Sequence, residues 1–216
     1  MRLALGSPVR CTDAPFGELA DVVVDPISRR VTHVVVEPHR DHGRARLVPI
    51  GWLSDEPDGL VLDRTTREVK ALEPVEASEY LRLGQVPALD PEHDIGVESF
   101  LALPLYQELD GLGTVVDPDP HATVIYDRVP KGEVEIRRSS AVVSADDHLL
   151  GRVDGFLVGR DGAFAGLVLE RGHLWAQREV VVPYDAVERV ENDAIRLSLT
   201  KDAVGSLPAR RVHRWF

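Results

Sequence analysis

Two loops of this chain carry residues whose types and spacing could bind a metal ion or a partner. In the first loop, His39, Asp41 and His42 lie within four positions of one another. Imidazole and carboxylate groups are zinc ligands, but a zinc site normally has a fourth fixed group, and the neighbouring sequence offers none. We therefore predict a solvated polar loop and no metal, with a three-ligand site in this loop as the alternative.

The second loop combines cationic side chains with an aromatic ring. Arginine and tryptophan dominate binding hot spots because they join a large contact area to directional hydrogen bonds. The alternative is an ordinary arginine–tryptophan packing pair within the same molecule. Because the two loops occupy equivalent places in an internal repeat, we predict that they share one recognition surface. Its candidate partner-binding residues are Arg40, His42 and Arg44 in the first loop, and Arg171, His173, Trp175 and Arg178 in the second.

The sequence patterns that indicate catalysis are missing. The chain has no nucleophile elbow, no phosphate-binding glycine loop and no paired Cys/His arrangement. Cys11 is the single cysteine, which excludes an intrachain disulfide and a multi-cysteine zinc site; we expect its thiol to be buried or idle. Asp13 aligns in the repeat with the pair Asp146-Asp147, and these aspartates are predicted to cap a turn. We therefore predict no enzymatic activity, no catalytic residue and no cofactor.

Composition places the chain among folded proteins. It has 216 residues, of which 44% are hydrophobic, and no apolar stretch reaches the ~18 residues of a membrane-spanning helix. The segment Met1–Pro8 is too short for a signal peptide, so we expect a cytoplasmic protein. The formal net charge of −11 is uneven, because residues 64–133 carry −8 and residues 134–216 carry zero. Whole-chain acidity therefore does not exclude an anionic partner at the second half.

The sequence repeats itself at an offset of about 134 residues. Residues 8–62 recur as residues 141–197, with the same residue types in the same order. Gly17 aligns with Gly151, at a point where a turn enters a strand and where we expect a positive φ or a close backbone approach. The other matched pairs include Val24 with Val158, Val31–Glu37 with Phe164–Glu170, and Pro49 with Pro183.

The pattern of each copy predicts an all-β unit. It contains about five short runs rich in β-branched residues, separated by Gly, Pro, Asp and Asn. The nearly continuous apolar runs at 31–37 and 164–170 predict a central strand that is buried on both faces. About sixty residues make a marginal core, and closing the strands on themselves would remove exposed edges. The sequence therefore predicts two small β-barrels.

The repeated pattern resembles the PRC-barrel family. It runs from Val9 to Pro49 and again from Val143 to Pro183, and it combines a glycine, an Asp-Pro or Gly-rich turn, a long apolar run and a Val-Pro end. This family includes the cytoplasmic domain of the photosynthetic reaction-centre H subunit and the C-terminal domain of the ribosome maturation factor RimM. The chain lacks the membrane helix of the first and the RNA-processing domain of the second, so neither partner transfers. The resemblance implies a protein-binding barrel without catalysis.

The segments outside the repeats are harder to read. We predict an irregular, acidic, proline-rich connector over residues 66–133, packed on the barrels. It begins with two short helical pieces over 65–83 that Pro74 separates, and strands at 124–127 and 134–136 would complete the second barrel. The basic tail, residues 208–216, is expected to fold back onto the acidic connector, with weak contact to RNA or to a membrane surface as the alternative.

These interpretations combine into a tandem protein. The first barrel would span residues 1–65 and the second residues 134–207, packed as a pseudo-dimer, and a homo-oligomer stays open. We expect a non-enzymatic cytoplasmic adaptor that binds a protein partner through its barrel loops. One alternative is an RNA- or ribosome-associated maturation factor that uses the arginine-bearing hairpins, and another is a small-molecule-binding regulator.

Overall fold

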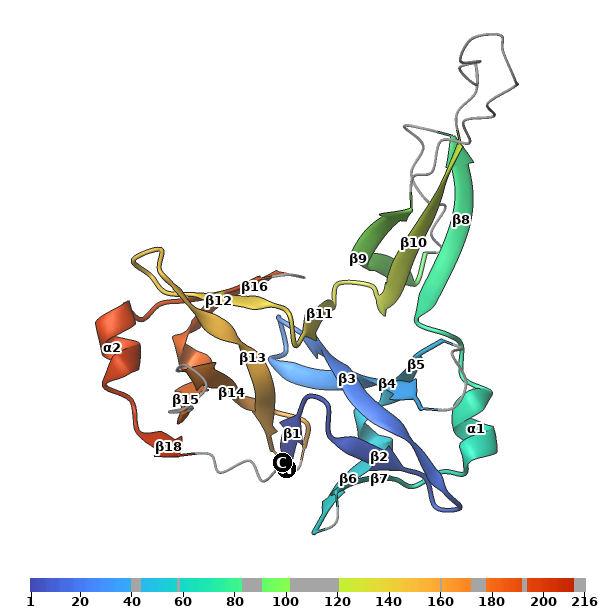
Figure 1. Cartoon of the computed structure of the whole chain (residues 1–216), viewed down its shortest axis with the longest axis horizontal. Coiled ribbons are helices and arrows are strands. Elements are labelled where there is room, and N and C mark those ends of the chain that lie inside the picture. Colours follow the sequence, from blue (N-terminus) through green and yellow to red (C-terminus); the bar gives the residue numbers. More distant parts are fainter. Residues whose placement is uncertain are drawn as a thin grey trace, which may run out of the picture.

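The computed structural model describes residues 1–39, 44–57, 59–82, 91–101, 121–159, 161–171, 178–191 and 194–211. Strands account for most of these residues, and the described helices are short (Figure 1). The fold is therefore all-β, as the sequence predicts. The strands form two large sheets, one for each sequence repeat, and a third, smaller sheet that comes from the connector.

The first sheet is built from the first repeat. A β-bulge between Leu19 and Asp21 shifts the register of its longest strand. A 3-10 turn, η1 (Ile50–Trp52), and a short helix, α1 (Thr66–Lys70), flank the sheet. Its strands follow the order β5 (Arg46–Pro49), β4 (Arg30–Pro38), β3 (Pro15–Asp25), β2 (Pro8–Arg10), β7 (Gly59–Leu62) and β6 (Leu53–Glu56).

The second sheet repeats this order, given below from its opposite end, and adds one strand, β18 (Ala209–Arg211), beside the counterpart of β5. A 3-10 turn, η2 (Tyr184–Ala186), and a short helix, α2 (Lys201–Gly205), take the places of η1 and α1. In both sheets the first strand of the repeat pairs in parallel with the last, through β2 and β7 or through β12 and β17. The strands are β16 (Val187–Glu191), β17 (Ala194–Leu197), β12 (Ala141–Val143), β13 (Leu149–Val158), β14 (Phe164–Arg171), β15 (Arg178–Pro183) and β18 (Ala209–Arg211).

The two sheets exchange one strand each. The N-terminal strand β1 (Arg2–Ala4) pairs with β13 of the second sheet, and Leu3 lies opposite Phe156. The strand β11 (Val134–Arg137), which precedes the second repeat, pairs with β3 of the first sheet, and Ile136 lies opposite Val22. Leu3 and Ile136 differ by 133 positions, close to the offset of the repeat. The prediction that residues 134–136 complete the second barrel is therefore wrong, because this segment completes the first sheet.

The exchange produces a shared hydrophobic core. Buried side chains from both sheets form one continuous cluster, which includes Leu3, Val22, Ile136, Phe156 and Leu167. Burying each such side chain contributes roughly 1.5–3 kcal/mol, so the interface between the repeats is a large part of the stability of both. The core joins the two repeats, which supports the expected pseudo-dimer.

The central strand of each sheet is buried on both faces, as predicted. In β4, Val34 and Val36 belong to the shared core, whereas Val35 belongs to a second, smaller cluster on the opposite face. The predicted close approach at Gly17 is confirmed, because a Cβ there would lie 1.9 Å from the carbonyl oxygen of Glu37. At the equivalent position, Gly151 has a positive φ of 150°.

The connector is more regular than the sequence indicates. Residue 74 does separate two pieces, but only α1 is helical, since Glu76–Arg82 form strand β8. β8 pairs with β10 (His121–Pro130), which pairs with β9 (His93–Leu101). This three-stranded sheet projects from the body of the molecule (Figure 1). Residues 124–127 therefore belong to it and not to the second repeat's sheet, and its base packs on the first sheet through Val75 and Val129.

Both large sheets curl, and each forms a half-barrel (Figure 1). Within the described residues no ladder joins β5 to β6, the end strands of the first sheet. The same holds for β16 and β18 in the second sheet. The closed tandem barrels predicted from the sequence thus stay a prediction, whereas the duplicated sheet topology is an observation.

Candidate partner-binding surface

The structure describes three of the seven candidate partner-binding residues. Arg44 is exposed and has a positive φ of 50° at the start of the segment that leads into β5. Arg171 ends β14 and Arg178 begins β15, so the loop between them is a hairpin, as predicted. The other four candidates, Arg40, His42, His173 and Trp175, lie outside the described residues.

The hairpin aligns arginines across strands. Arg171 lies directly opposite Arg178, and Arg178 lies directly opposite Arg211 on β18. These three positions, which we call the arginine row, follow one line across β14, β15 and β18. Like charges that lie opposite one another destabilise a sheet, so such a row favours a nearby anion. The sequence indicates the basic character of Arg211 but gives no sign of its pairing with β15.

The next row of the same strands carries two glutamates and one arginine. Glu170 lies opposite Glu179, and Glu179 lies opposite Arg210. The Glu179 carboxylate also accepts a hydrogen bond from Arg2 Nη2 at 2.6 Å. The described part of the tail thus pairs with β15, and the prediction that it folds onto the connector is wrong for residues 209–211. Residues 212–216 lie outside the described residues.

The equivalent hairpin of the first repeat uses its arginines differently. Arg46 donates a hydrogen bond through Nη1 to the main-chain oxygen of Arg44 at 2.6 Å. Through Nε it donates a longer bond to the main-chain oxygen of Lys70, at the end of α1. The guanidinium of Arg46 therefore holds the hairpin to α1, and Arg44 is the exposed cation there.

The two aligned aspartates begin the two helices. Asp13 accepts hydrogen bonds from the Thr66 main-chain N–H at 2.8 Å and from the Thr66 hydroxyl at 2.9 Å. Asp146 accepts a hydrogen bond from the main-chain N–H of Lys201 at 2.9 Å. The Thr66 N–H lowers the pKa of Asp13, and hydrogen bonds from Ser144 and from the Lys201 N–H lower the pKa of Asp146. The predicted capping role is confirmed, and the capped elements are α1 and α2.

Among the described residues, two groups have strongly raised pKa values: Cys11 is buried and Asp21 is half-buried. Burial, reinforced by Asp13 and Glu68, raises the pKa of the Cys11 thiol to about 11, so the thiolate is scarce at neutral pH. Burial also raises the pKa of Asp21 to about 6, against the opposing effect of Arg137. Arg137 forms an ion pair with Asp127 of β10 and lies 3.7 Å from the buried Glu135. This cluster joins the first sheet, β11 and the base of the connector sheet.

The described residues contain no cluster of three or more His, Cys, Asp or Glu side chains that could hold a metal ion. His39 is exposed, and its main-chain N–H donates to the Phe16 oxygen at 3.2 Å. Asp41 and His42 lie outside the described residues, so the three-ligand alternative is not tested.

Two findings bear on the class of protein. Within the described part of the chain, no helix has the length and apolar character that crossing a membrane requires. Comparison of the sequence with protein-family models and with curated proteins finds no match. The PRC-barrel resemblance therefore stays an expectation from the sequence.

Proposed function

We propose that this protein is a non-enzymatic cytoplasmic adaptor that binds an acidic segment of a protein partner at the arginine row. The observation that carries the proposal is the register of β14, β15 and β18, which places Arg171, Arg178 and Arg211 side by side. A carboxylate-bearing segment along this row would relieve the repulsion between like charges and form forked hydrogen bonds with the guanidinium groups.

Two further observations support binding over catalysis. Of the described groups with the most raised pKa values, Cys11 is buried in the first sheet and Asp21 is half-buried on β3. The duplicated sheets share one core, which provides a rigid platform for the hairpins. The resemblance to PRC barrels carries the same expectation of a protein-binding barrel.

A protein partner fits the charge of the chain better than RNA does. The formal net charge is −11, with the excess acidity in residues 64–133. A long polyanion would be repelled by that acidity while it gained only a few phosphate contacts, whereas a short acidic segment can engage the arginine row alone.

The test is affinity capture from the native lysate with the full chain as bait, analysed by mass spectrometry. We expect a protein whose capture resists nuclease treatment and weakens at least tenfold with the double variant Arg171→Ala/Arg178→Ala. The matched control, Arg67→Ala/Arg189→Ala, removes the same charge from exposed positions away from the row and should leave capture unchanged. Loss of capture after nuclease treatment would indicate RNA binding and overturn the proposal, as would equal capture by both double variants.

A further inference from the structure

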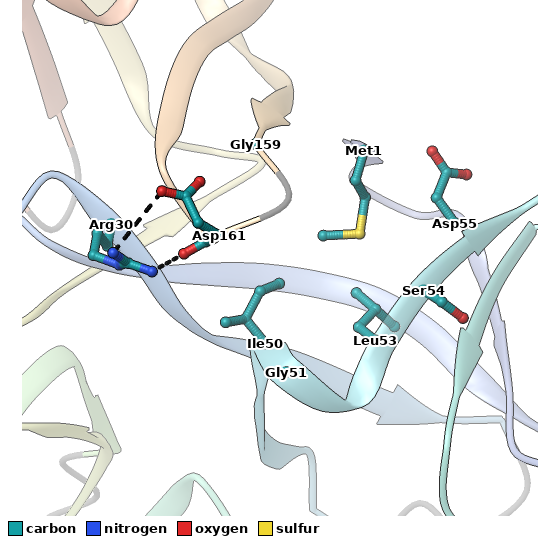
Figure 2. A pocket seen from close by; sticks show the side chains of 10 residues that line it. Met1, Arg30, Ile50, Gly51, Leu53, Ser54, Asp55, Gly159 and Asp161 are labelled. Carbon is teal, nitrogen blue, oxygen red and sulfur yellow. Dashed lines mark hydrogen bonds and ion pairs between the residues drawn. The ribbon is translucent and has the colours of Figure 1, made fainter.

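A pocket lies where the two repeats meet (Figure 2), and its lining includes no residue of the arginine row. Its volume is about 640 Å³, which is in the range of small-molecule sites. Met1, Ile50 and Leu53 supply apolar groups, and Arg30, Asp55 and Asp161 supply charged ones. The first repeat contributes β4, η1 and β6, and the second contributes the turn between β13 and β14.

The same place in the second repeat is filled by aromatic rings. Phe164 pairs with Val158 as Val31 pairs with Val24, and Tyr184 begins η2 as Ile50 begins η1. The rings of Phe164 and Tyr184 pack edge to face, with their centroids 4.8 Å apart. The guanidinium of Arg29, from the turn of the first repeat, lies over the Tyr184 ring at 5.2 Å from its centroid.

The pocket is lined by Ile50, the counterpart of Tyr184. Both turns that flank the junction are joined by reciprocal main-chain bonds, from Val31 N–H to Gly162 oxygen at 2.9 Å and from Phe164 N–H to Arg29 oxygen at 3.0 Å. On the open side Ile50 carries no ring, and a Cβ on Gly51 would meet no atom within 4 Å. On the filled side this place holds a planar ring, and on the open side Gly162 stands where the filled side has Arg29.

The charged groups of the pocket indicate which polar groups the edge of a bound ring should carry. Arg30 is held in place because its Nη2 donates to the main-chain oxygen of Asp161, and its Nη1 lies 4.0 Å from the Asp161 carboxylate. The Asp161 side chain is 66% exposed, and the Ala163 N–H lowers its pKa, so it is ionised at neutral pH. Asp55 accepts the Arg2 N–H at 3.1 Å and keeps further lone pairs. Two carboxylates around an apolar floor favour a ligand that donates N–H groups.

We propose that this pocket binds a free small molecule with a planar nitrogen heterocycle whose edge donates N–H groups, as a purine does. The ring lies over the apolar floor with one face against the Arg30 guanidinium, a cation–π contact of the kind that Arg29 makes with Tyr184. Its N–H groups donate to Asp55 or Asp161. This site is independent of the partner-binding surface proposed above.

The test is calorimetric titration of the full chain with guanosine, whose ring N–H and exocyclic amino group lie on one edge. We expect a Kd below 1 mM for guanosine and no binding of benzoate, which has a ring of similar breadth but no N–H donor. The ring could come from a free nucleoside or from a nucleotide of an RNA chain, and a five-nucleotide RNA with one guanosine distinguishes these two sources. Tighter binding of that RNA than of guanosine would overturn the proposal of a free small molecule, as would a native protein that does not bind guanosine.

Two variants locate the site. Ile50→Tyr introduces the ring of the filled side and should abolish guanosine binding without lowering the thermal midpoint. Its matched control is Ile27→Tyr, which adds the same ring at a side chain that is 89% exposed. Asp55→Asn keeps the shape and removes the charge, and should weaken binding about tenfold. Unchanged affinity in a folded Ile50→Tyr variant would show that guanosine binds elsewhere and would overturn the proposal.

Discussion

The two exchanged strands, β1 and β11, pair with their partner sheets at equivalent positions, which we call the crossings. The residues that lie opposite one another at the two crossings differ in their chemistry. In the first sheet, Arg137 of β11 lies opposite Asp21, whereas in the second sheet Ala4 of β1 lies opposite Gly155. A Cβ at Gly155 would lie 2.3 Å from the Leu3 carbonyl oxygen, so only glycine allows that approach. The first crossing is covered by the connector sheet, which brings Asp127 to Arg137.

This difference shows which features the duplicated topology requires. Leu3 and Ile136 are both fully buried beside the crossings, so an apolar anchor is common to the two sheets. The polar residues near each crossing differ because different elements pack on the outside of the two sheets. Equivalent strands can therefore keep one pairing pattern while one crossing carries a buried charge cluster and the other carries close main-chain contact.

The largest expected effect comes from removing the shared anchors. We expect Leu3→Ala and Ile136→Ala each to lower the free energy of unfolding by about 2–5 kcal/mol, because each leaves a cavity in the same core. Urea denaturation of the full chain measures both. Ile27→Ala, at an exposed position, is the control with little expected change. A large cost for one anchor and none for the other would contradict the equivalence of the two crossings.

The pH dependence of stability should distinguish the two crossings, with an effect of intermediate size. Burial raises the pKa of Asp21 to about 6, so the folded state binds more protons than the unfolded chain between about pH 4 and 6. Stability from this group is therefore present below the unfolded pKa and is lost as the pH rises through the folded value.

We expect Asp21→Asn to remove this loss, so that its stability relative to the native protein improves by about 1–3 kcal/mol between pH 4 and pH 7. Urea denaturation at both pH values measures the difference. Gly155→Ala, at the second crossing, should destabilise equally at both. A pH-independent effect of Asp21→Asn would show that Asp21 titrates normally.

The smallest effect should come from the helix starts, where the repeats are most alike. Asp13→Ala and Asp146→Ala each remove an acceptor for the first N–H of a short helix, so both should lower the thermal midpoint at pH 7 by less than the anchor variants do. Differential scanning calorimetry gives the comparison, with Glu188→Ala as an exposed control. A midpoint that falls for only one of the two variants would mean that the capping contacts are not equivalent.

Features that lie within one repeat could be predicted from the sequence. Alternating and continuous valine runs predicted the strands, and the aligned Gly17, Asp13 and Asp146 predicted contacts that the structure shows. All of these features depend on neighbours close along the chain or within one module. The same holds for the hairpin that carries Arg171 and Arg178.

The partners of β1, β11, β10 and β18 were not predictable in the same way. A three- or four-residue strand such as Val134–Arg137 has the same pattern whichever sheet it joins, because pairing over more than a hundred residues is decided by the whole core. The pocket at Arg30 and Ile50 was missed for a related reason. It arises from two turns distant in sequence, and the signal in the alignment of the repeats was the replacement of Phe164 and Tyr184 by Val31 and Ile50.

The strand exchange also sets the order in which this chain can fold. Arg2 pairs with Leu157, and Asp21 pairs with Arg137. During synthesis, the part of β3 that pairs with β11 therefore stays unpaired on that side until more than a hundred further residues have been made. Contacts of such high sequence separation slow folding. They also tie both sheets into one unfolding transition, since neither sheet can be opened without withdrawing a strand from the other.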